Sequence, residues 1–194
     1  MKLYGITGGI GSGKSVAMQS WLRLGWPAVD TDEIARDLVE PGSDALAEIS
    51  REFGSKVLSV NGVLDRQALA RIVFADRGAR TRLEKILHPR IRVEWRRVVE
   101  VWRAEGCKSA AVVIPLLFET HAEEEFDRVI CVACSPELQR TRLLGRGWDD
   151  VEIERRLKSQ WSVSEKMNFA DYVVWNESTV EVLDQQIEWI SQHQ

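Results

Sequence analysis

The stretch GGIGSGKS at residues 8–15 decides the fold of this 194-residue chain. It satisfies the pattern G-x-x-x-x-G-K-[ST] between the apolar segment KLYGIT and a segment of helical character, SVAMQSWLRLG. Glycines let the backbone curl so that its amides face phosphate oxygens, Lys14 supplies a mobile positive charge, and the start of a helix adds a favourable dipole. A purely structural turn does not require lysine followed by serine at a helix start. The stretch therefore predicts a loop that binds nucleotide phosphates.

Apolar runs of strand length recur along the chain, mostly separated by longer segments with helical periodicity. The runs are nearly continuous in apolar residues, which is typical of strands buried on both faces in a parallel sheet covered by helices. We therefore expect an α/β protein with a doubly wound, five-stranded sheet. Its strands should lie at residues 3–7, 28–30, 110–114, 129–134 and 172–175.

The segment 31–109, between the second and third predicted strands, is far longer than one crossover helix needs, so it predicts a helical insertion. Short helices are expected at 34–39, 44–53 and 65–74, the last beginning with a good cap at Asp65. A longer helical pattern over 77–105 predicts a break or kink at His88-Pro89. A final helix over 180–190 should pack Val182, Leu183, Ile187 and Ile190 onto the sheet.

The composition gives no general reason to expect nucleic-acid or membrane binding. The formal net charge is -4, and no segment approaches the roughly 20 apolar residues of a membrane span. The apolar start of the chain is interrupted by glycines too early for a secretory signal. We expect a soluble, cytoplasmic protein.

The three cysteines do not form a disulfide framework or a four-ligand zinc set. Cys131 and Cys134 fall in an apolar run of strand character, where positions three apart point to opposite faces. They are predicted to be buried packing residues.

Several classes of phosphate-binding-loop protein can be separated by their other motifs. A GTPase switch needs an Asn-Lys-x-Asp segment, which is absent from the sequence, and a motor ATPase needs a strand that ends in Asp-Glu. Here the third strand instead continues into Pro115, and the second ends in Asp30-Thr31-Asp32. Strand ends of a parallel sheet converge on the ligand crevice, so Asp30 and Asp32, projecting to the same side, would stand near the γ-phosphate. The alternative is that both aspartates only cap a helix beginning near Glu33.

A cluster of basic residues follows the fourth strand and is typical of the lid that kinases close over ATP. It includes Arg140, Arg142 and Arg146 and continues to Arg155 and Arg156. The alternative, a solvated helical face balanced by acidic neighbours, fits Arg155 better than Arg142 or Arg146.

Six blocks in this order resemble the dephospho-coenzyme A kinase family over most of the chain: TGGIGSGKS, VDTDEIARDLVEPG, LEKILHPRI, IPLLFE, an Arg-x-x-x-Arg lid and ADYVVWN. The resemblance implies a three-layer P-loop kinase fold in a single unit. Its parts would be a nucleotide-binding core of residues 1–30, 108–138 and 168–194, an acceptor-binding helical insertion at 31–107 and a helical lid at 139–167. It implies transfer of the ATP γ-phosphate to the ribose 3′-hydroxyl of dephospho-coenzyme A, the last step of coenzyme A synthesis.

The resemblance also implies a set of residues at the nucleotide. Ser15 would coordinate the required Mg²⁺. Val16 stands where the family commonly has threonine, so one hydroxyl contact to phosphate is missing. The nucleotide-binding set is Gly9, Gly11, Ser12, Gly13, Lys14, Ser15, Val16, Arg146 and Asn176.

The catalytic set implied by the resemblance is Asp32, Lys14 and a lid arginine, Arg140 or Arg142. Asp32 would orient the acceptor hydroxyl and receive its proton late in the reaction, with Asp30 supporting it or reaching magnesium through water. The acceptor-binding set is Asp30, Asp32, Arg36, His88, Arg90 and Leu117.

The expected partners are ATP and dephospho-coenzyme A, with no nucleic acid and no membrane, for a monomer or small homo-oligomer. A nucleoside monophosphate kinase shares the core and lid but binds another acceptor, and its second-substrate motifs are not evident. A regulatory protein with the same loop would not need Asp32, His88 or the lid arginines.

Overall fold

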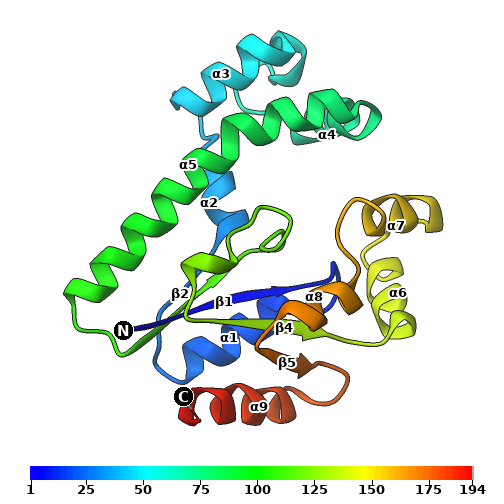
Figure 1. Ribbon diagram of the computed structural model, residues 1–194. Helices are drawn as coiled ribbons and strands as arrows, with labels where there is room; N and C mark the ends of the chain where they lie inside the picture. The colour runs from blue at the N-terminus through cyan, green and yellow to red at the C-terminus, as the bar shows by residue number, and fades with distance from the viewer. Residues whose placement is uncertain (194) are drawn as a thin grey trace. The chain divides into compact units, whose positions relative to one another are not determined.

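The structure is a computed structural model that describes residues 1–193. The chain forms two compact units (Figure 1). Unit 1 comprises Met1–Asp30 and Val101–Gln194, and unit 2 comprises Thr31–Glu100.

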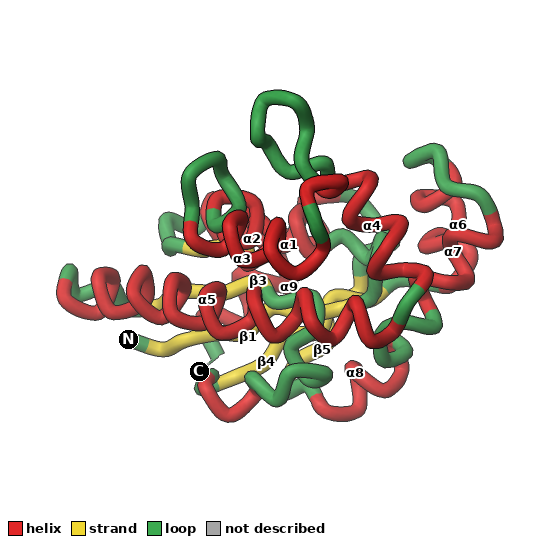
Figure 2. Tube along the Cα trace, turned by 90° about the horizontal axis from the view of Figure 1, so that it is seen from above, coloured by secondary structure: helices red, strands yellow, loops and turns green. Residues whose placement is uncertain are grey.

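Unit 1 is built on a five-stranded sheet whose strands run side by side (Figure 2). The order is β2-β3-β1-β4-β5, and every neighbouring pair is parallel. The predicted α/β fold with a five-stranded parallel sheet is therefore confirmed. The strands are β1 (Lys2–Gly8), β2 (Ala28–Asp30), β3 (Ser109–Val113), β4 (Arg128–Ala133) and β5 (Tyr172–Trp175).

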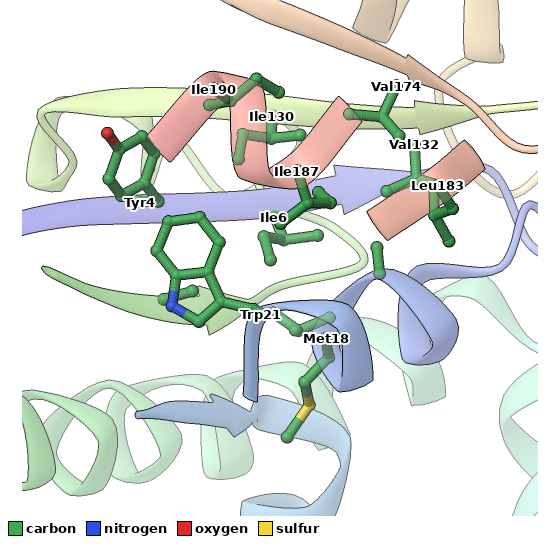
Figure 3. Packing of buried hydrophobic residues seen from close by; sticks show 13 residues of the cluster. Tyr4, Ile6, Met18, Trp21, Ile130, Val132, Val174, Leu183, Ile187 and Ile190 are labelled. Atoms are coloured by element: carbon green, nitrogen blue, oxygen red, sulfur yellow. The ribbon is translucent and has the colours of Figure 1, made fainter. Parts of the chain in front are cut away.

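Two helices cover one face of this sheet: α1 (Lys14–Arg23) and α9 (Val180–Gln192) (Figure 3). Alternate residues of β1, Tyr4 and Ile6, face them, and the ring of Trp21 of α1 packs against Tyr4 at a tilt of 59°, with ring centroids 4.7 Å apart. Gly5 faces the opposite side, where a Cβ would lie 2.6 Å from Leu117 Cδ1. The remaining helices of unit 1 are α6 (Pro136–Leu144), α7 (Asp150–Leu157) and α8 (Val163–Phe169), and α8 packs against β1 and β4.

Two sequence predictions about the core of unit 1 are wrong in part. Leu183, Ile187 and Ile190 are buried, as predicted, but Val182 is 39% exposed because it lies about 100° around the helix from Leu183. Strand β5 is not buried on both faces: Val173 is 41% exposed. As the last strand of the sheet, β5 has a neighbour on one side only.

The cysteine prediction is confirmed, since Cys131 and Cys134 are buried and unpaired by any disulfide. Burial raises the pKa of Cys131 to about 11 and also raises that of Cys134. Both side chains are therefore neutral packing groups at neutral pH.

Unit 2 is helical, as predicted for the insertion. Its elements are α2 (Thr31–Asp37), α3 (Asp44–Phe53), the short 3-10 turn η1 (Ser55–Val57), α4 (Arg66–Ala75) and α5 (Arg77–Ala104), whose last turn extends into unit 1. The predicted cap is present, because the Asp65 side chain accepts a hydrogen bond from the amide of Ala68 at 2.9 Å. Apolar residues from α3, α4 and α5 form a separate core that includes Ile49, Leu69 and Ile86.

Of the predicted break or kink at His88-Pro89, the break is wrong, because α5 continues through Pro89. A proline inside a helix removes one backbone donor and disturbs the preceding turn. In that turn the Ile86 carbonyl accepts a hydrogen bond from Arg90 Nη1 at 2.6 Å. The arginine also pairs with Glu48 Oε2 of α3 at 2.6 Å.

Candidate active site

The loop between β1 and α1 has the backbone that phosphate binding requires. Gly11 and Gly13 have φ values of 77° and 100°, in the left-handed region that favours glycine. Helix α1 begins at Lys14 directly after Gly13, so its N-terminus opens at the loop. Helix N-termini carry unpaired amides and a positive end of the dipole, which together favour an anion.

Lys14 folds back over the start of its own loop. Its ammonium group donates hydrogen bonds to the carbonyl oxygens of Gly8 and Gly9, each at 3.0 Å. These contacts hold a positive charge above the loop, and the first two carbonyls of the motif are turned toward it.

Three side chains from distant parts of unit 1 bind the next carbonyls of the loop. Gln139 of α6 donates to the Ile10 carbonyl at 2.7 Å. Arg142, one turn further along α6, donates through Nη1 to the Ser12 carbonyl at 3.2 Å, and Asn176 donates through Nδ2 to the same oxygen at 2.8 Å. With donors bound on their carbonyl side, these peptide groups are fixed in orientation, and the amide concavity typical of such loops is preorganised for phosphate.

The arginines predicted to belong to a lid occupy different environments. Arg142 also donates through Nη2 to the Asn176 carbonyl at 3.0 Å, so it joins α6, the loop and the end of β5. Arg140 instead pairs with Asp150 at 2.6 Å, in a pair that is about half exposed. Arg146 is exposed in the turn after α6. Of the two arginines considered for catalysis, only Arg142 contacts the phosphate-binding loop among the contacts of the described residues.

The alternative interpretation, in which Arg155 belongs to a solvated helical face, is confirmed. Arg155 pairs with Glu152 on α7 and is 46% exposed. Its neighbour Arg156 pairs with the same carboxylate at 2.6 Å and lies 4.2 Å from the ring centroid of Trp148. These contacts organise α7 itself.

Asp30 and Asp32 belong to different elements. Asp30 ends β2 and is partly buried, whereas Asp32 is exposed in the first turn of α2, which begins at Thr31. The expectation that the two side chains project to one side of a strand is therefore wrong, because the chain turns into a helix after Asp30. The capping alternative is also wrong for Asp32, which lies inside the helix rather than before it. A carboxylate in the first turn remains favourable to the helix dipole.

Within unit 2, the predicted acceptor residues differ in exposure. Arg36 on α2 is exposed, and Arg90 is tied to Glu48. His88 is partly buried, and burial lowers its pKa, assisted by Arg80 and opposed by the nearby Glu84 carboxylate. His88 is consequently neutral at pH 7 and can accept or donate a hydrogen bond.

Leu117, the remaining predicted acceptor contact, lies in unit 1 with no exposed surface. It packs beneath the sheet against Gly5. In this arrangement Leu117 is a core residue that offers no surface to a ligand.

A family model described as dephospho-CoA kinase matches residues 2–181, which is most of the chain. The chain belongs to the dephospho-CoA kinase family. The resemblance inferred from the sequence motifs is therefore confirmed.

Individual members of the dephospho-CoA kinase family align over nearly their whole length. A dephospho-CoA kinase of Bdellovibrio bacteriovorus is 40% identical over 99% of this chain and 98% of its own. One of Anaeromyxobacter dehalogenans is 45% identical over 94% of this chain and 87% of its own. The solved dephospho-CoA kinase of Campylobacter jejuni has a TM-score of 0.73 at 30% identity, covering 100% of this chain and 97% of that one.

A crystal structure of a Thermus thermophilus protein is similar as well, with a TM-score of 0.83, 32% identity and coverage of 99% and 97%. A shikimate kinase structure from Bacteroides thetaiotaomicron, at 15% identity and a TM-score of 0.50, shares the fold alone. Dephospho-CoA kinase members therefore use the architecture of other small-molecule kinases.

Two residues of this dephospho-CoA kinase family member, Gln139 and Lys166, have contacts that the sequence motifs did not predict. Gln139 stood in the lid pattern, but nothing local indicated that it reaches Ile10. Lys166 lies in the polar segment SVSEKMNF and has the sequence environment of a surface residue, yet it is fully buried. Only tertiary contacts reveal either one.

Among the described residues, no helix combines the length and apolarity needed to cross a membrane.

Proposed function

We propose that this protein transfers the γ-phosphate of ATP to the ribose 3′-hydroxyl of dephospho-CoA, giving CoA and ADP in the last step of CoA synthesis. The observation that carries the proposal is the phosphate-binding loop, whose carbonyls at Ile10 and Ser12 are held by Gln139, Arg142 and Asn176. Membership of the dephospho-CoA kinase family supports the choice of acceptor.

The nucleotide end of the site is assigned to the loop and α1. Backbone amides of Gly11 and Gly13 receive phosphate oxygens, and Lys14 exchanges its contacts with the loop carbonyls for the β- and γ-phosphates. The exchange is favourable because an ammonium group binds anionic oxygen more strongly than a neutral carbonyl.

Ser15 fits the role of a magnesium ligand. Ser15 is an exposed residue in the first turn of α1, and Mg²⁺ takes oxygen ligands while keeping several waters, so one protein hydroxyl beside phosphate oxygens suffices. When bound, the ion neutralises phosphate charge. Asp30, at the end of β2, is the second oxygen donor that we assign to it, through water.

Asp32 is assigned to the acceptor. A loose phosphoryl-transfer transition state asks mainly that the nucleophile be positioned, so a carboxylate that holds the 3′-hydroxyl and takes its proton late is sufficient. Arg36, His88 and Arg90 supply two cations and a neutral imidazole on unit 2. These groups match an acceptor that carries a pyrophosphate.

Arg142 is assigned to the nucleotide rather than Arg140, because its guanidinium lies 3.2 Å from the Ser12 carbonyl whereas Arg140 pairs with Asp150. Arg146, exposed after α6, is the further lid residue assigned to the phosphates. Val16 lacks a hydroxyl, so its side chain donates no hydrogen bond to phosphate. In this proposal residues 31–107 bind the acceptor and 139–167 form the lid of a cytoplasmic monomer or small homo-oligomer.

The test is an ADP-release assay with ATP, Mg²⁺ and a panel of acceptors comprising dephospho-CoA, AMP, adenosine and shikimate. Selective turnover of dephospho-CoA is expected. Selective turnover of AMP would identify a nucleoside monophosphate kinase instead, and binding of ATP without turnover of any acceptor would identify a regulatory protein.

A further inference from the structure

Lys166 is a buried charged residue that has no part in the proposed phosphoryl transfer. Its side chain in α8 has no exposed surface. The ammonium group lies 2.9 Å from Glu119 Oε1 and donates a hydrogen bond to the Pro115 carbonyl at 2.6 Å. Replacing a buried ion pair with apolar residues is often neutral or stabilising, so stability alone does not call for a lysine here.

The Pro115 carbonyl joins Lys166 to the strand that leads into the phosphate-binding loop. This oxygen also accepts a hydrogen bond from Thr7 Oγ1 at 3.3 Å, and Thr7 immediately precedes Gly8. The segment after β3 is thus bound from one side by α8 and from the other by the end of β1.

Glu119 extends the same network toward the lid. Its Oε1 atom accepts a hydrogen bond from the backbone amide of Trp161 at 2.9 Å, in the turn between α7 and α8. Since Glu119 also pairs with Lys166, one carboxylate fixes both the approach to α8 and its interior.

The start of α8 forms a wall of the phosphate-binding loop. A Cβ added to Gly9 would lie only 2.5 Å from Val163 Cγ2, so Val163 packs directly on the loop backbone. Val163 is the first residue of α8 and precedes Lys166 by three positions, which places both within one turn. Any shift of α8 therefore moves the surface against which Gly9 rests.

We infer that Lys166 is a positioning residue for the phosphate-binding loop. By anchoring α8 and the segment after β3 to one another, it sets Val163 against Gly9 and Thr7 against Pro115. The loop then holds its phosphate-binding shape before ATP binds, so ATP binding does not lose free energy to ordering the loop. The inference rests on the proposed function only in that the loop binds ATP.

The test separates this role from a purely structural one by removing the pair together. In Lys166→Met the Glu119 carboxylate is left buried without its partner, so the melting temperature should fall strongly. In the double variant Lys166→Met/Glu119→Gln neither member of the ion pair is charged. Most of the loss in melting temperature should therefore be recovered. The KM for ATP in the double variant should still be raised about tenfold, the equivalent of one hydrogen bond to a charged group, with kcat changed less than about threefold.

A matched control is Lys158→Met, which removes an exposed lysine from an ion pair with Glu154. It should change neither the melting temperature nor the KM for ATP. Calorimetric titration with ATP in the absence of acceptor should show the same roughly tenfold loss of ATP affinity in the double variant. That measurement remains decisive even if the wild-type protein turns over none of the acceptors.

Recovery of both the melting temperature and the ATP affinity in the double variant would overturn the inference, and so would a loss confined to kcat. If the lysine variants do not fold, Val163→Ala gives the answer, because it keeps the ion pair and only trims the wall against Gly9. A raised dissociation constant for ATP in Val163→Ala supports the inference, and an unchanged one overturns it.

Discussion

Gly13→Ala tests the packing of the phosphate-binding loop most directly, because an added Cβ meets two separate costs. The backbone at Gly13 has φ of 100°, and a left-handed backbone costs a residue with a side chain about 1–2 kcal/mol. A Cβ there would also lie 1.9 Å from Asn176 Nδ2, so the amide must move away from the Ser12 carbonyl. Loss of that buried hydrogen bond adds about 1–3 kcal/mol, toward the lower end because Arg142 still donates to the same oxygen.

Gly25→Ala is the matched control. Gly25 has φ of 82°, but a Cβ at that position meets nothing within 4 Å. It therefore carries the backbone cost alone. Urea unfolding should show a loss of about 1–2 kcal/mol for Gly25→Ala and about 2–5 kcal/mol for Gly13→Ala.

A third variant identifies the source of the difference. Adding Asn176→Ala to Gly13→Ala should cost almost nothing further, since the hydrogen bond is already lost, whereas Asn176→Ala in the wild-type background should cost about 1 kcal/mol. Equal losses for Gly13→Ala and Gly25→Ala, or full additivity of the two substitutions at the loop, would refute the proposed packing.

Asp32→Asn should lower kcat by about 10²–10⁴ through loss of the proton acceptor, while the calorimetric dissociation constant for ADP stays unchanged; near-normal turnover would remove Asp32 from the mechanism. Arg142→Ala should raise the KM for ATP about tenfold, whereas Arg140→Ala should change it less than about twofold because exposed ion pairs contribute little, and the reverse order would exchange their roles. Burial lowers the pKa of His88 in the folded protein. Below the pKa that His88 has in the unfolded chain, the unfolded chain therefore binds a proton that the folded protein does not. The free energy of unfolding should fall as the pH drops from 7 toward 5. His88→Asn should make the urea midpoint depend less on pH in this interval, and an identical pH dependence in both proteins would contradict the burial argument.

The sheet could be predicted from the sequence because its central strands are continuous apolar runs in a regular alternation with helices. The prediction was wrong at β5, which is an edge strand, and at Val182, which lies on the exposed face of α9. A strand's place in the sheet depends on pairing with distant segments, and local periodicity does not encode it. Local sequence likewise failed at Pro89, because the penalty for a proline does not by itself end a helix whose remaining turns are packed, as α5 is through Ile86 and Trp95.

The phosphate-binding loop could likewise be predicted from eight residues, because its glycines, lysine and serine act through local backbone geometry. Of the donors to its carbonyls, Arg142 and Asn176 were among the residues implied by the family resemblance, but Gln139 was not, since it lies in a polar helical segment typical of surfaces. Asp32 shows a different error: its position after a strand was recognised, but α2 already begins at Thr31, so Asp32 lies in a helix and not on an extension of the strand. Where the chain changes from strand to helix, a shift of one residue alters where every following side chain points.

The contacts from α6 to the loop carbonyls imply a reciprocal thermodynamic coupling. Gln139 and Arg142 fix the loop only while α6 is folded, so local unfolding of α6 must weaken nucleotide binding. By linkage, bound nucleotide must protect the backbone amides of α6 from hydrogen exchange by the same factor. The affinity of the eight-residue motif is thus partly a property of a helix that begins more than a hundred residues later in the chain.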